Sequence, residues 1–92
     1  MVELRVFGKD FRNEEYEKMR EAAEAVAQHY EGKVSVVEYD FRSEEANELG
    51  IARCPALSVN DRVVAVGVTP QVGSLIIKVG DALAEAAHSA DE

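Results

Sequence analysis

The chain has 92 residues, of which 47% are hydrophobic and 30% are charged, and its 18 acidic and 10 basic side chains give a formal net charge of -8. This length predicts one domain with one modest core, and the balance of apolar and charged residues is typical of a globular protein. The acidic charge repels phosphate backbones and anionic lipid surfaces, so we expect neither a nucleic acid nor a membrane as partner.

Cys54 is the only cysteine in the chain. A single cysteine excludes an internal disulfide and a cysteine-cluster metal site, and it fits a reducing compartment. The first five residues precede no long apolar run, and no run of about 18 apolar residues follows anywhere, so neither a signal segment nor a spanning helix is predicted. We therefore expect a cytoplasmic protein with no metal and no cofactor.

The first half of the chain predicts a strand, a helix and a second strand. Residues 2–7 alternate with a period of two, which places Val2, Leu4 and Val6 on a buried face and Glu3, Arg5 and Phe7 on the other. A helix then follows Asp10 or Asn13, either of which can cap it, and ends before Gly32. Its apolar positions step by three or four: Tyr16, Met19, Ala23, Val26, Ala27 and Tyr30. Residues 33–39 are short and rich in valine, which favours a strand parallel to the first.

The second half predicts a short helix, a hairpin and a last helix. Ser43 caps the short helix, which ends at Gly50. Residues 56–59 and 62–66 form strands joined by the tight turn Asn60-Asp61. Thr69 caps the last helix with Pro70 as its first residue, and the apolar stripe runs from Val72 to Ala86.

This order predicts an α/β fold of βαβ and ββα units with a four-stranded mixed sheet and helices on both faces. We expect a single domain over residues 1–92, with a core of about residues 2–87 and a frayed tail at 88–92. The first and last helices would share one face of the sheet. Glu3, Arg5 and Ser58 would point to the other face, which only the short helix covers and which should stay partly wet.

The combination resembles the minimal thioredoxin or glutaredoxin fold over residues 2 to about 87. The residues that carry the resemblance are the Val6-Phe7-Gly8 strand end, the segment at 54–59, the Asn60-Asp61 turn and Gly67 before the last helix. The resemblance implies that the peptide bond before Pro55 is cis and that residue 54 lies beside the start of the first helix.

The chain departs from this family at the start of the first helix. Family members carry a Cys-x-x-Cys there, because the helix N-terminus stabilises a thiolate. Here the stretch is residues 9–14, and Phe11 and Glu14 stand about where the two sulfurs would be. The dithiol mechanism is therefore removed, because neither an attacking nor a resolving thiol exists at that place.

A candidate binding groove remains between residues 9–14 and 53–56. Cys54 is its single candidate for catalysis, and half-buried packing is the alternative role for this thiol. Lys9 and Arg12 would favour a thiolate, whereas the neighbouring acidic residues would oppose it. The residues predicted to form the groove are Lys9, Phe11, Arg12, Glu14, Arg53 and Pro55.

Two functional hypotheses from different classes follow. The first is a non-redox module that binds a protein or an extended peptide by strand addition beside Pro55. The alternative is a single-thiol redox enzyme or sensor, in which Cys54 forms a mixed disulfide with glutathione or with another protein. Whether the protein is an enzyme stays open at this point. A homodimer through the wetter sheet face, with Glu3 and Arg5, is a third hypothesis.

Overall fold

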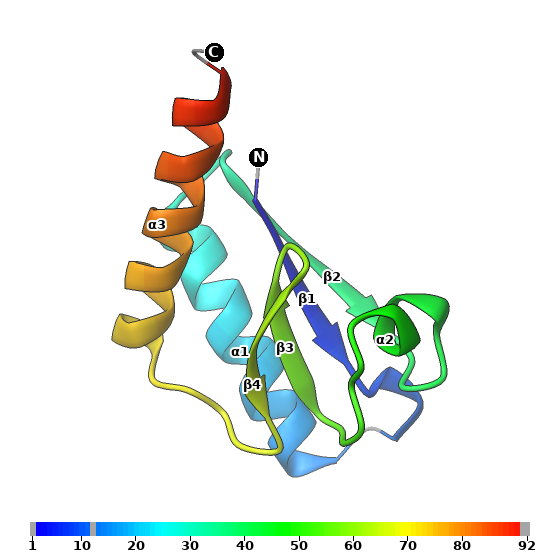
Figure 1. Ribbon diagram of the computed structural model, residues 1–92. Helices are drawn as coiled ribbons and strands as arrows, with labels where there is room; N and C mark the ends of the chain where they lie inside the picture. Colours follow the sequence, from blue (N-terminus) through cyan, green and yellow to red (C-terminus); the bar gives the residue numbers. More distant parts are fainter. Residues whose placement is uncertain (1, 12, 91–92) are drawn as a thin grey trace.

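The computed structural model describes residues 2–11 and 13–90, and for residue 11 and residues 86–90 it describes the backbone alone. Strands and helices follow in the predicted order (Figure 1). They are β1 (Val2–Phe7), a 3-10 turn (Lys9–Phe11), α1 (Glu14–His29), β2 (Val34–Tyr39), α2 (Glu44–Glu48), β3 (Ala56–Val59), β4 (Arg62–Val66) and α3 (Val72–Ala90).

The four strands form one mixed sheet in the order β2-β1-β3-β4. β1 pairs with β2 in parallel, and the β1/β3 and β3/β4 pairs are antiparallel. Leu4 shows the register, since it lies opposite Val36 on one side and Val59 on the other. The predicted mixed α/β sheet with helices on both faces is confirmed.

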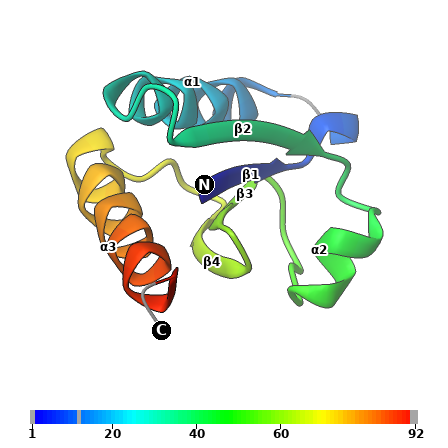
Figure 2. The ribbon, with the colours of Figure 1, turned by 90° about the horizontal axis from the view of Figure 1, so that it is seen from above.

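One face of the sheet is covered by α1 and α3, while α2 lies on the other face (Figure 2). Asn13 begins α1 as its N-cap, because its side-chain oxygen accepts a hydrogen bond from the Tyr16 N–H at 2.8 Å. Both helices pack on β1 and β3 through a continuous apolar cluster. This main core includes Leu4, Val6, Tyr16, Met19, Val26, Leu57, Leu75 and Val79, all fully buried.

The second face is drier than the strand pattern predicts. Phe7, expected on the wet side, is completely buried in a small cluster with Ala46 and Ala56. Its ring stacks on Tyr39 with centroids 5.3 Å apart. Ser58 is also completely buried, because its hydroxyl donates to the Asn60 carbonyl at 2.9 Å and needs no water. Glu3 and Arg5 are half-buried there, as expected.

The hairpin turn is built on Asn60, which adopts a φ of 54°. Asparagine tolerates this left-handed conformation better than most residues. The Asn60 N–H donates to the Glu3 carbonyl at 2.8 Å, and the Glu3 N–H donates to the Asn60 side chain at 2.9 Å. The turn is thereby fastened to β1. A β-bulge between Leu57 and Ser58 shifts the β3/β4 register, which no local pattern in the sequence predicts.

The last helix differs from its prediction at both ends. Thr69 and Pro70 precede it without a helical conformation, and the helix begins at Val72. Thr69 instead donates from its N–H and its hydroxyl to the Glu15 carboxylate on α1, a tertiary partner that replaces the capping role. At the other end, helical backbone continues to Ala90, beyond the expected limit of about residue 87.

We expect the side of α3 that carries Leu75 to hold this helix against the main core. Leu75→Ala should lower the free energy of unfolding by about 2–5 kcal/mol, because the leucine is 0% exposed in the main core. Ile77→Ala, two residues further along the helix, should change it by less than about 0.5 kcal/mol, because Ile77 is 67% exposed. Urea unfolding followed by circular dichroism measures both, and equal losses would contradict this packing.

Candidate functional site

The segment between α2 and β3 forms one side of the site. It leaves α2 through Gly50 and Ile51, whose N–H groups donate to the Asn47 and Ala46 carbonyls. Arg53 is exposed, Cys54 is half-buried and Pro55 is buried, with a cis peptide bond between the last two. Pro55 thus supports the site from beneath rather than lining its surface.

Gly8, the residue after β1, brings this segment against the rest of the sheet. A Cβ placed on Gly8 would lie 2.9 Å from the Cys54 Cβ and 3.6 Å from Cδ2 of the Tyr16 ring. The φ of Gly8 is +115°, a backbone conformation that residues other than glycine rarely adopt. Cys54 therefore lies at the end of β1, next to the first turn of α1.

The backbone of residues 52–54 is available for pairing. Its N–H and C=O groups form no hydrogen bond within the described part of the chain. The next carbonyl, that of Pro55, is used, because it accepts from the Gly67 N–H at 2.7 Å. The free polar backbone thus ends where β3 begins.

Exposed apolar side chains border the same segment. The Gly67 bond to Pro55 places Val66 and Val68 beside it, and these valines are 44% and 71% exposed. Exposed apolar groups that gather at one place are typical of interaction sites. Neither valine was predicted as a site residue, although the change of period after β4 marks Val68 as outside any buried stripe.

The other side of the predicted groove is only partly described. Lys9 and Glu14 are exposed, and Lys18 lies 4.0 Å from the Glu14 carboxylate. Asp10 does not cap α1, because its carboxylate accepts from the Phe41 N–H at 2.7 Å. The Phe11 side chain and Arg12 lie outside the described residues.

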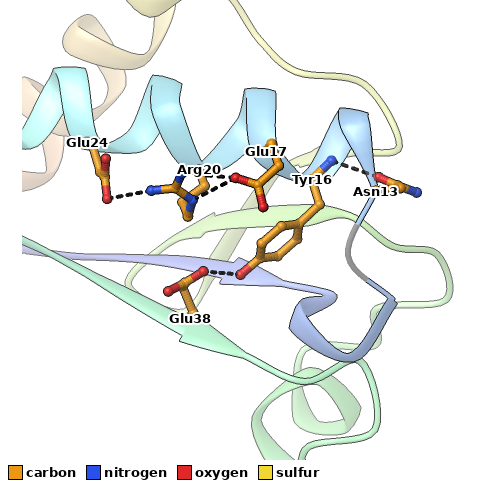
Figure 3. Close-up of polar contacts among 6 residues, drawn as sticks. All are labelled: Asn13, Tyr16, Glu17, Arg20, Glu24 and Glu38. Carbon is orange, nitrogen blue, oxygen red and sulfur yellow. Dashed lines mark hydrogen bonds and ion pairs between the residues drawn. The ribbon is translucent and has the colours of Figure 1, made fainter.

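Acidic side chains near the start of α1 act in its packing. Glu17 lies 2.9 Å from the Arg20 guanidinium, which also contacts Glu24 (Figure 3). Tyr16 is fully buried and its hydroxyl donates to the Glu38 carboxylate of β2. The Tyr16–Glu38 contact fastens the first turns of α1 to β2, whereas the Arg20 contacts with Glu17 and Glu24 lie within α1 itself.

Glu15 connects the start of α1 with the loop before α3. The hydroxyl of Thr69, its N–H and, more weakly, the charge of Lys18 hold the pKa of the Glu15 carboxyl below its ordinary value, although burial opposes them. The loop that carries Val68 is therefore fastened to the first turn of α1 by a charge-assisted contact.

The chemistry open to the site is limited by its single sulfur. One cysteine in the sequence means that no dithiol exists. Residues 2–11 and 13–90 contain no group of three or more metal-ligating side chains that could hold an ion. In the same part of the chain no helix is long and apolar enough to cross a membrane.

Sheet order and helix placement define a thioredoxin-like α/β protein. The family model described as a thioredoxin domain matches residues 3–78. The chain belongs to this thioredoxin domain family, and it does so with one cysteine and without the Cys-x-x-Cys. None of the curated proteins with which the sequence was compared matches it.

The close approach of Gly8 and Cys54 predicts a strong substitution effect. Gly8→Ala should lower the free energy of unfolding by more than the roughly 1–2 kcal/mol of left-handed backbone strain, because its methyl group would also crowd the Cys54 Cβ. Gly50→Ala should show the backbone cost alone, since its φ is +69° with open space around it.

The same comparison in a Cys54→Gly background isolates the crowding. There the cost of Gly8→Ala should fall, because the Cys54 Cβ is absent. Urea unfolding of the wild type, Gly8→Ala, Cys54→Gly and the double variant of both positions measures this difference. An unchanged cost in that background would refute the contact between the two residues.

Thr69→Val should raise the pKa of Glu15 toward its ordinary value, because the hydroxyl donor is lost, whereas Thr69→Ser should keep it low. A depressed carboxyl pKa stabilises the fold above the unfolded value of about 4.3, and this contribution disappears as the pH falls through the folded value. Carboxyl NMR titration of Glu15 gives the pKa directly. Identical titration curves for wild type and Thr69→Val would contradict this assignment.

Proposed function

We propose that the protein is a non-redox binding module for an extended peptide segment of a partner protein. The partner backbone pairs with residues 52–54, and its side chains rest on Val66 and Val68. Strand addition of this kind draws affinity from main-chain hydrogen bonds and specificity from neighbouring side chains.

The observation that carries the proposal is the free backbone of residues 52–54 beside two exposed valines. An unpaired stretch of backbone at the surface is a ready template for another chain. Burial of the exposed apolar area next to it stabilises the complex, which hydrogen bonds to the backbone edge alone would do less strongly. Arg53, exposed on the same segment, adds a cation for an acidic partner residue.

A single-thiol redox role for Cys54 is the competing function. In that role the Cys54 thiolate attacks a disulfide of glutathione or of a partner, forms a mixed disulfide and releases the other sulfur as a thiolate. The half-buried thiol at the same surface keeps this chemistry within reach. Peptide binding requires no such step, so the two functions separate when Cys54 is replaced.

The test is selection of short random peptides on the purified protein, followed by amide NMR titration with the selected sequences. Bound peptide should perturb the amides of residues 51–54 and 66–68. Val68→Glu should weaken binding by about tenfold or more, equivalent to about 1.4 kcal/mol, because a carboxylate replaces the exposed valine. Ile77→Glu is the matched control, since Ile77 is 67% exposed on α3, and it should leave the affinity unchanged.

Cys54→Ser separates the two functions. The serine variant should retain peptide affinity under reducing conditions if the module binds without redox chemistry. Loss of capture in Cys54→Ser, together with a mixed disulfide in the wild type, would replace the proposal with the single-thiol function. Equal weakening by Val68→Glu and Ile77→Glu would refute the location of the surface.

A further inference from the structure

A second hollow lies at the other end of the sheet from Cys54. It is enclosed by the β3–β4 turn and β4 on one side and by α3 on the other, and its volume is about 440 Å³. The β3–β4 turn lies toward the end of the sheet where the chain begins, whereas α2 lies at the opposite end (Figure 1). The hollow is therefore separate from the proposed peptide surface.

Its apolar lining comes from three valines and an alanine. Val59, Val63 and Val64 contribute from the hairpin, and Ala82 contributes from α3. A volume of this size falls in the range of small-molecule sites, which are commonly apolar with a few polar groups that set orientation. The lining thus suits a small aliphatic group.

Charged side chains of both signs surround this apolar lining. Arg62 on β4 and Lys78 on α3 supply two cations, and Asp61, Asp81 and Glu85 supply three carboxylates. None of the five forms an ion pair or a hydrogen bond with another described residue. Each wall of the hollow therefore presents a cation and at least one carboxylate to a ligand.

The geometry of β4 disfavours a peptide as the occupant. β4 is an edge strand, but the register shift opposite Leu57 and Ser58 leaves Val64 as an extra residue in its ladder. Bulges of this kind interrupt pairing and turn an edge away from further strands. A small molecule needs no continuous ladder, so the hollow fits it better.

We propose that this hollow binds a small zwitterion with an aliphatic group, of which a free aliphatic amino acid is the simplest example. Its carboxylate lies by Arg62 and Lys78, its ammonium group lies by Asp81 and Glu85, and its aliphatic part rests on the valines. The charged groups are exposed, so each ion pair contributes little and the binding is weak. This site does not depend on the peptide-binding function.

The test is amide NMR titration of the full chain with L-leucine. Leucine at millimolar concentration should perturb the amides of residues 59–64 and 78–85 and leave those of residues 52–54 unchanged. Two truncated probes isolate the charges: 4-methylpentanoate lacks the ammonium group, and 3-methylbutylamine lacks the carboxylate. Each should bind several-fold more weakly than leucine. Equal binding of the truncated probes, or no perturbation by leucine at these residues, would overturn the proposal.

Matched substitutions test the roles of individual residues. Arg62→Gln and Asp81→Asn should each weaken leucine binding by about threefold, the size expected for an exposed ion pair. Arg53→Gln is the control at the far end of the sheet and should have no effect. All three substitutions change exposed side chains, so the spectra of the free variants should otherwise match that of the wild type. Unchanged leucine affinity in Arg62→Gln and Asp81→Asn would refute the assignment of the charges.

Discussion

The burial of β1 is the constraint on which the rest of the structure depends. β1 is hydrogen-bonded along both edges, to β2 and to β3, and apolar side chains leave it toward both faces. Val2, Leu4 and Val6 enter the main core under α1 and α3, while Phe7 enters the small cluster under α2. Because both apolar clusters share this strand, a substitution that shifts the β1 backbone in one cluster also disturbs the packing of the other.

The end of β1 also determines where the candidate site lies. Gly8 has no side chain, so Cys54 and Pro55 can approach the strand end closely, and the free backbone before them stays at the surface. The Gly67–Pro55 hydrogen bond brings the end of β4 to this place, and the Glu15–Thr69 contact fastens the loop with Val68 to the first turn of α1. The site is therefore assembled from four separate stretches of chain, although only one of them carries a sulfur.

The β3–β4 hairpin connects the two proposed binding regions without merging them. Pro55 and Gly67 meet at one end of the hairpin, and Asn60 is fastened to β1 at the other. Four residues of β3 separate these ends, which at about 3.3 Å per residue places them more than 10 Å apart. Substitutions at the two ends of the hairpin should therefore act independently, because distant sites without shared partners behave additively.

The sequence by itself determined the elements, their order and the absence of a dithiol. Periodicity, the Asn13 cap, the Asn60 turn and the glycines at element ends are local signals, which act over a few residues and can be interpreted without neighbours. Only the tertiary structure decided that Phe7 and Ser58 are buried, that Thr69 binds Glu15 instead of capping α3, and that Val66 and Val68 border the Cys54 segment. Each of these depends on a partner distant in the chain, and the burial and hydrogen-bonding energies that select such partners arise only when the layers pack together.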